Sequence, residues 1–368
     1  MKKKTQKHYS LGYFNTARGL AVAFVIIGHS MALFLTQLPA MPTLPIFAGA
    51  GRVIGGGIMA ALFMISGFYF KRRPMKRCVK VQTRLLLKPY ILTSASIVVI
   101  KGIKAAVEGR SFRDEGLKLV ITHIFGFNAA KNTTFLGVPV GTVSIFWFVL
   151  ALYAGWIIFN RICHFETKAA RVVAVISCVL IGWDLCALSS VWPMALPMAL
   201  LATGYIAAGY LIRRKRFLDK KPRLLVRILI VEVSLICLAF GNVDIAACVW
   251  KLGPLDVMGS FCVGYLLLLL YSKIMDGPAG RAIFKRTDNI GIHSLQILCV
   301  HALEKAVIPW QNLSKVFPNQ PVLCIALCTL CRFLLIQLII VTVAKVRRLA
   351  RRKKRIKIEI TPDEEECK

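Results

Sequence analysis

The sequence predicts an all-α membrane protein, a polytopic bundle of about ten transmembrane helices with both termini in the cytoplasm. Three observations lead to this prediction. Of the 368 residues, 57% are hydrophobic, and the mean hydropathy is +0.65, which is more than a soluble domain of this size can bury. The apolar residues form runs long enough to cross a bilayer. The 49 lysine and arginine residues lie mostly in short stretches between these runs.

The formal charge of +32 could suggest a nucleic-acid-binding protein. Such proteins gather their basic residues on a folded polar domain, whereas here the basic residues flank apolar runs. That pattern is typical of cytoplasmic loops in a multi-pass membrane protein. Membrane lipids are therefore the expected partner, and nucleic acid is not.

The apolar runs predict ten spans. The first follows a basic N-terminus like that of a signal peptide, but its apolar stretch continues past Ser30 without a cleavage pattern, so we expect it to be retained. The 107–142 connection between the third and fourth spans is expected to hold a short interfacial helix over residues 117–127. The ten spans cover residues 15–36, 52–70, 85–106, 143–160, 169–188, 194–212, 223–241, 254–274, 290–308 and 321–344.

The positions of the basic residues predict the orientation. If the N-terminus is inside, the cytoplasmic side receives most of the lysines and arginines, and the C-terminus is also inside. The predicted localisation is the cell membrane, with a bacterial plasma membrane expected. The predicted regions are a cytoplasmic basic N-terminus (1–14), a transmembrane domain (15–344) and a cytoplasmic tail of basic and then acidic residues (345–368).

The first span carries two conspicuous residues, Arg18 and His29. They are eleven positions apart, which at about 100° per residue puts them on one helix face, roughly 16 Å apart along the axis. Arg18 is expected at the membrane boundary and His29 near the middle of the bilayer. An ionisable group at that depth is costly, so His29 is a candidate site residue.

The motifs of several spans together resemble one family. The first span reads R-G-x-A-x-x-x-V-x-x-G-H from Arg18 to His29, and the second contains L-F-M-I-S-G-F. The fourth contains F-W-F-V-L-A-L-Y from Phe146 to Tyr153, and the ninth reads S-L-Q-I-L-C-V-H from Ser294 to His301. In order and spacing, these segments are similar to those of the integral-membrane acyltransferase family 3. The resemblance covers almost the whole membrane region.

The sequence departs from the family pattern at four places. Asn15 stands where many members have aspartate, and Leu298 replaces the usual tyrosine. Ala61 and Leu62 replace paired aromatic residues, and the three consecutive glycines at 55–57 are unusual. These departures leave the acceptor subgroup open, and they keep an acyltransferase-like protein with lost activity as an alternative.

The resemblance implies an O-acyltransferase with a cytoplasmic acyl-CoA donor, acetyl-CoA being expected, and a hydroxyl acceptor on a cell-envelope glycan or a lipid. Arg18 would hold a coenzyme A phosphate through charge-assisted hydrogen bonds. His29, kept neutral by burial, would take the proton of the acceptor hydroxyl. The long pantetheine arm would bridge the distance between them.

Four further residues complete the predicted site. His301 in the ninth span is expected to orient the acceptor or relay a proton, with a purely structural hydrogen bond as the alternative. Glu304 lies on the same face of that helix and is predicted to assist in substrate binding. Ser66 beside the histidine is either a hydrogen-bond partner or a small packing residue. Trp147 is expected to form a pocket wall.

Glu232 and Arg332, in the seventh and tenth spans, are predicted to form a structural ion pair. Together with His29 they also suggest the second function considered, a secondary transporter of an anionic solute. The related halves typical of transporters are not evident in the sequence. The twelve cysteines lack metal-ligand spacing, so no metal is expected. A homodimer through small lipid-facing residues stays open.

Overall fold

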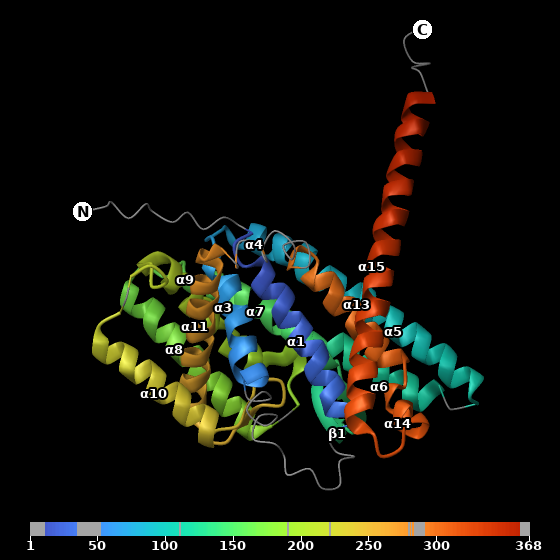
Figure 1. The fold of residues 1–368 in the computed structure, drawn as a ribbon, viewed down its shortest axis with the longest axis horizontal. Helices are drawn as coiled ribbons and strands as arrows, with labels where there is room; N and C mark the ends of the chain where they lie inside the picture. Colours follow the sequence, from blue (N-terminus) through green and yellow to red (C-terminus); the bar gives the residue numbers. More distant parts are fainter. Residues whose placement is uncertain are drawn as a thin grey trace.

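Helices make up nearly all of the fold in the computed structural model, as Figure 1 shows. The structure describes residues 12–34, 53–109, 112–189, 191–220, 222–278, 280, 282 and 291–360. The main helices are α1 (Asn15–Phe34), η2 and α3 (Val53–Ile58, Met59–Phe68), α4, η3 and α5 (Met75–Gln82, Thr83–Leu87, Lys88–Val107), α6 (Phe112–Phe125), η4 and α7 (Ser144–Phe146, Trp147–Ile162), α8 (Lys168–Leu188), η5 and α9 (Pro193–Ala195, Leu196–Lys215), α10 (Leu224–Phe240), α11 (Pro254–Asp276), α13 (Ser294–Val307), η6 and α14 (Trp310–Asn312, Leu313–Val316) and α15 (Pro321–Ile360).

Each of the ten predicted spans falls on a helix of the structure. Among the described residues, seven helices are long and apolar enough to cross a membrane. The second, seventh and ninth predicted spans correspond to shorter helices, α3, α10 and α13. The all-α membrane class is therefore confirmed, while the count of ten spans and the orientation stay predictions.

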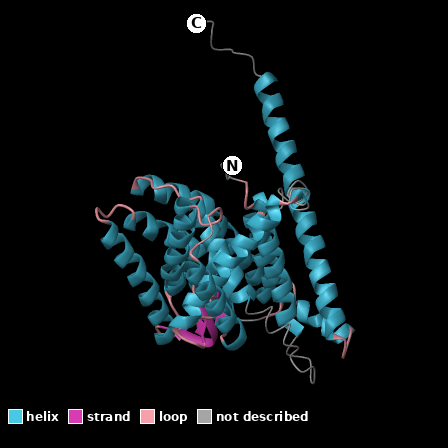
Figure 2. Cartoon of the chain, turned by 60° about the vertical axis from the view of Figure 1, so that its left-hand side comes forward, coloured by secondary structure: helices cyan, strands magenta, loops and turns pink. Residues whose placement is uncertain are grey.

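The long connection between the third and fourth predicted spans forms α6, as expected, and then a β-hairpin that was not predicted. The strands are β1 (Asn128–Phe135) and β2 (Val138–Thr142). A second small hairpin, β3 (Val243–Asp244) and β4 (Val249–Trp250), connects α10 to α11. Asn128 Nδ2 donates to the carbonyl oxygen of Ala246 over 2.5 Å. This bond joins the two hairpins at one end of the helical bundle (Figure 2).

The centre of the bundle consists of α3, α7 and α9. Phe63, Leu150 and Tyr205 are fully buried there, and the Phe63 and Tyr205 rings stack with centroids 6.0 Å apart. Tyr205 also shares a 2.5 Å hydrogen bond with Ser260 of α11, which satisfies its hydroxyl inside the core. By contrast, α8 and α10 expose most of their apolar side chains, as helices that face lipid do.

The contact between α3 and α9 depends on two glycines that face the opposite backbone. A Cβ atom on Gly67 would lie 2.0 Å from the carbonyl oxygen of Ile206, and one on Gly209 would lie 1.9 Å from that of Met64. Backbones come this close only where side chains are absent. The two helices thus pack as a small-residue pair at the core of the bundle.

Gly67→Ala is expected to destabilise the protein by about 1–3 kcal/mol, because the new methyl group forces α3 and α9 apart. Thermal unfolding in detergent would measure this as a lower midpoint. Gly141→Ala is the matched control, since its Cβ atom would meet Lys118 and Thr122 at an ordinary 3.6 Å. Equal midpoints for the two variants would contradict the close helix contact.

The first and last spans run in opposite directions and leave their free ends on one side. Figure 1 shows α1 beginning on the side of the bundle where α4 lies, and α15 projecting beyond the bundle on that same side. The helix of the tenth predicted span does not stop near residue 344 but continues to Ile360. The basic stretch that follows the span is thus part of the same helix.

Candidate functional site

The N-terminal end of α1 is fixed by aromatic side chains. The Tyr271 hydroxyl donates to the carbonyl oxygen of Tyr13 over 2.7 Å, and the Tyr13 hydroxyl donates to Ser272 Oγ over 3.1 Å. One turn further, the Arg18 guanidinium carbon lies 5.5 Å from the centroid of the Tyr69 ring, a cation–π contact. Arg18 is half-buried. Its charge is therefore held at the same end of α1 as the basic helix α4.

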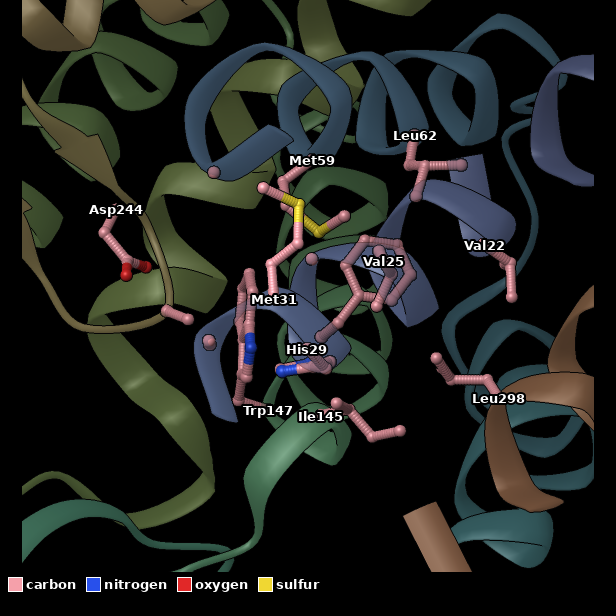
Figure 3. Close-up of a pocket in the computed structure, with 15 residues that line it drawn as sticks. Val22, Val25, His29, Met31, Met59, Leu62, Ile145, Trp147, Asp244 and Leu298 are labelled. Atoms are coloured by element: carbon pink, nitrogen blue, oxygen red, sulfur yellow. The ribbon is translucent and has the colours of Figure 1, made fainter. Parts of the chain in front are cut away.

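A cavity of about 370 Å³ lies beside the rest of α1 (Figure 3). Its walls come from α1, the η2–α3 segment, the start of α7, the β3–β4 hairpin and α13. The lining residues are Val22, Val25, Gly28, His29, Met31, Ala32, Gly55, Met59, Leu62, Ile145, Trp147, Phe148, Asp244, Ala246 and Leu298.

The cavity wall is apolar except for two side chains that can ionise, His29 and Asp244. Trp147 and Phe148 cover one side, as Trp147 was predicted to do. Val22 is the lining residue nearest to Arg18 in the sequence, four residues away, or about 6 Å along the helix. An apolar chamber with one imidazole favours a neutral ring that can exchange a proton with a bound molecule.

Asp244 was not predicted as a site residue. It lies on β3, where its Oδ1 accepts a hydrogen bond from the Ala247 backbone over 3.0 Å. The hairpin sits directly on η2, because a Cβ atom on Gly55 would lie only 2.7 Å from the carbonyl oxygen of Val243. The unusual glycine run thus lets the hairpin reach the cavity. The sequence contains one sign that Asp244 could belong to a site: it is the one acidic residue of the 241–253 connection.

Behind His29 lies a buried polar cluster. His301 Nδ1 is 2.6 Å from Glu304 Oε1, and Arg332 Nε is 3.3 Å from the same oxygen. Arg332 Nη1 donates to Ser30 Oγ over 3.0 Å, and the Trp310 indole donates to the other Glu304 oxygen. These five residues, Ser30, His301, Glu304, Trp310 and Arg332, are called the Glu304 cluster below. The rings of His29 and His301 are 5.5 Å apart between centroids, so the cluster adjoins the cavity.

The predicted site residues therefore occupy different places. His29 and Trp147 line the cavity, while His301 and Glu304 lie behind it and are buried. Ser66 lies on α3 and is not among the residues that line the cavity. The predicted shared face of His301 and Glu304 is confirmed by their hydrogen bond. Substrate contact by any of these residues stays a prediction.

The predicted ion pair between Glu232 and Arg332 is wrong. Arg332 is fully buried and pairs with Glu304, whereas Glu232 has an exposed side chain on α10. Figure 1 shows α10 and α15 on opposite sides of the bundle. Depth in a span does not reveal which carboxylate a cation meets, because that depends on how the helices pack. The composite site suggested for a transporter is therefore not formed.

The structure places Leu298, one of the four departures from the family pattern, in the cavity wall. A tyrosine at this position would add a hydroxyl to the wall, so the leucine makes the chamber more apolar. The described residues contain no group of three or more histidine, cysteine, aspartate or glutamate side chains placed to hold a metal ion.

Comparison with known proteins gives one match. A family model described as an acyltransferase domain matches residues 11–341, which include α1, the cavity and the Glu304 cluster. No curated protein and no solved structure matches the chain.

Proposed function

The chain belongs to this acyltransferase family, and from that premise we propose that it moves an acetyl or similar short acyl group from cytoplasmic acyl-CoA to a hydroxyl. The acceptor we propose is a glycan or lipid-linked molecule of the cell envelope. The protein is a multi-pass membrane acyltransferase that acts on groups other than amino-acyl groups. The observation that carries the proposal is the single imidazole in the apolar cavity, on the same helix as Arg18.

The donor is proposed to enter from the side of α4 and Arg18. Several basic residues precede and follow α4, and the half-buried guanidinium of Arg18 lies at the same end of α1. An arginine can bind a coenzyme A phosphate with two parallel hydrogen bonds. The pantetheine arm would then run along α1 and bring the thioester carbonyl beside His29, roughly 16 Å away.

The acceptor is proposed to enter from the end of the bundle that holds the two hairpins. Trp147 offers a flat apolar face, and Asp244 offers a carboxylate whose Oδ2 can accept hydrogen bonds from hydroxyl groups. This combination suits a molecule with both CH-rich faces and hydroxyls, as sugars have. The acceptor hydroxyl would give its proton to His29 as its oxygen attacks the thioester carbon. The thiolate of coenzyme A would leave with that proton.

The test is acyl transfer by the purified protein in lipid nanodiscs. Release of free coenzyme A from acetyl-CoA would be followed with and without extracted envelope glycan and lipid fractions. We expect acceptor-dependent release, together with label from acetyl-CoA in the acceptor. If no fraction supports transfer with acetyl-, propionyl- or succinyl-CoA, the proposed function is wrong.

Arg18→Ala is expected to raise KM for acetyl-CoA by about tenfold or more, since a lost charge-assisted hydrogen bond costs about 1.5–3 kcal/mol. The value of kcat should change less, because the phosphate is far from the reacting carbonyl. Initial rates over a range of acetyl-CoA concentrations would separate the two constants. A variant that changed kcat alone would contradict phosphate binding by Arg18.

Asp244→Asn is expected to raise KM for the acceptor by about tenfold, because a hydrogen bond to a charged group is exchanged for one to a neutral amide. KM for acetyl-CoA should stay the same. The matched control is Asp184→Asn, which alters an exposed aspartate on α8 outside the cavity. If both variants behave like the wild type, Asp244 does not bind the acceptor.

A further inference from the structure

Lys305 contacts the proposed base directly but has no part in the reaction described so far. Its Nζ lies 3.2 Å from Nδ1 of His29. Among the described residues, Lys305 is the one hydrogen-bond partner of the His29 ring. Lys305 follows Glu304 on α13, 276 positions away from His29 in the sequence, and its side chain is partly buried.

The direction of this hydrogen bond decides what His29 can do. A neutral imidazole carries one N–H group and one lone pair, on different nitrogens. If a Lys305 ammonium donates to Nδ1, the proton of His29 is on Nε2, and that nitrogen can only donate to a substrate. If Nδ1–H donates to a neutral Lys305 amine, Nε2 carries the lone pair and can act as a base.

The charges around Lys305 favour the neutral amine. The titratable groups that interact with it electrostatically are His29 from α1, His301 and Glu304 from α13, and Arg332 from α15. The one carboxylate among them already contacts Arg332, His301 and the Trp310 indole. Among the described residues, an ammonium at Lys305 would be a second cation beside Arg332 without a carboxylate of its own, which is costly in an apolar interior. With a neutral amine, Glu304 and Arg332 balance each other.

We propose that Lys305 is a positioning residue that accepts the Nδ1–H of His29 and so fixes Nε2 as the base. This inference rests on the proposed acyl transfer. The acceptor O–H bond breaks as its proton goes to Nε2, and the oxygen forms the new C–O bond. The C–S bond breaks, and the sulfur takes the electron pair and then the proton from Nε2. Lys305 accepts the Nδ1–H hydrogen bond of His29, which becomes stronger in the transient imidazolium and stabilises it.

Two substitutions separate this role from a structural one. Lys305→Met removes the acceptor of the Nδ1–H, while Lys305→Arg places a permanent cation and donor beside Nδ1. We expect Lys305→Met to lower kcat by about tenfold or more with KM nearly unchanged, and Lys305→Arg to lower kcat further, because it enforces the wrong tautomer. Lys315→Met, at an exposed lysine of α14, is the control and should match the wild type. An arginine variant as active as the wild type would overturn the proposal.

The tautomer can be measured without any substrate. Nitrogen-15 NMR of histidine-labelled protein in lipid, with the His29 signals identified from their loss in His29→Gln, should show a protonated Nδ1 and an unprotonated Nε2 in the wild type. It should show the reverse in Lys305→Arg. A wild-type protein with Nε2 protonated would overturn the proposal. Absence of acyl transfer with the expected tautomer would instead overturn the proposed function alone.

Discussion

Replacing His29 with glutamine is expected to lower kcat by about 10²–10⁴-fold, the range typical of a lost general base. Glutamine fills similar space in the cavity wall and can still accept a hydrogen bond, but it cannot take up the acceptor proton. KM for acetyl-CoA should change little, because the phosphate-binding end lies at Arg18. Coenzyme A release and label transfer to the acceptor would measure the effect.

The control for this variant is His164→Gln. His164 lies in the turn after α7, where its Nδ1 contacts the Asn160 carbonyl oxygen at 2.7 Å, and it does not line the cavity. The same chemical change at this site should leave transfer intact. Full activity of His29→Gln would show that another group acts as the base, and the cavity would then need a different catalytic assignment.

Arg332→Met is expected to destabilise the protein by about 3–5 kcal/mol, because it leaves the buried carboxylate of Glu304 without its cation. Glu304 and Arg332 are 4% and 0% exposed, so solvent cannot replace the lost partner. Thermal and denaturant unfolding in a fixed detergent would measure the change. The loss should exceed that of Gly67→Ala, which alters packing but no charge.

The double variant Arg332→Met with Glu304→Gln tests the cause. Removing both charges should recover much of the stability, because the neutral amide can still accept from the Trp310 indole through its oxygen and donate to His301 Nδ1 through its NH2 group. The two single effects would then sum to more than the double effect. If they simply add, Glu304 and Arg332 do not act as a pair, and the Glu304 cluster is held by other contacts.

The helices of this protein could be predicted because their signal is local. Long apolar runs bounded by basic residues indicate spans regardless of what surrounds them, so each predicted span falls on a helix of the structure. The two hairpins were not predicted, because their strands carry no such local signal. The β3 and β4 strands are two residues each, and β1 carries mostly polar residues, so neither shows an alternating pattern long enough to recognise.

Some residues of the candidate site could likewise be predicted from the sequence, and others could not. His29, Arg18 and Trp147 belong to motifs within single spans and could be proposed from the sequence. Asp244 and Lys305 could not, because each lies at the edge of an apolar run where acidic and basic residues are ordinary. Their interest comes only from neighbours that lie far away in the sequence. Lys305 contacts His29, 276 positions away, and Asp244 lines the cavity together with residues of α1, α7 and α13.

The sequence by itself determined the membrane class, the helices and the first-span pair of Arg18 and His29, since these follow from hydropathy and from positions along one helix. Only the tertiary structure decided which carboxylate faces Arg332 and which residue faces Nδ1 of His29. Many polar groups lie at similar depths in the predicted spans, and hydropathy does not show which of them meet. The packing of the helices determines the pairs. The buried charges then pair with whatever the packed helices bring within a few ångströms, which here is Glu304 and not Glu232.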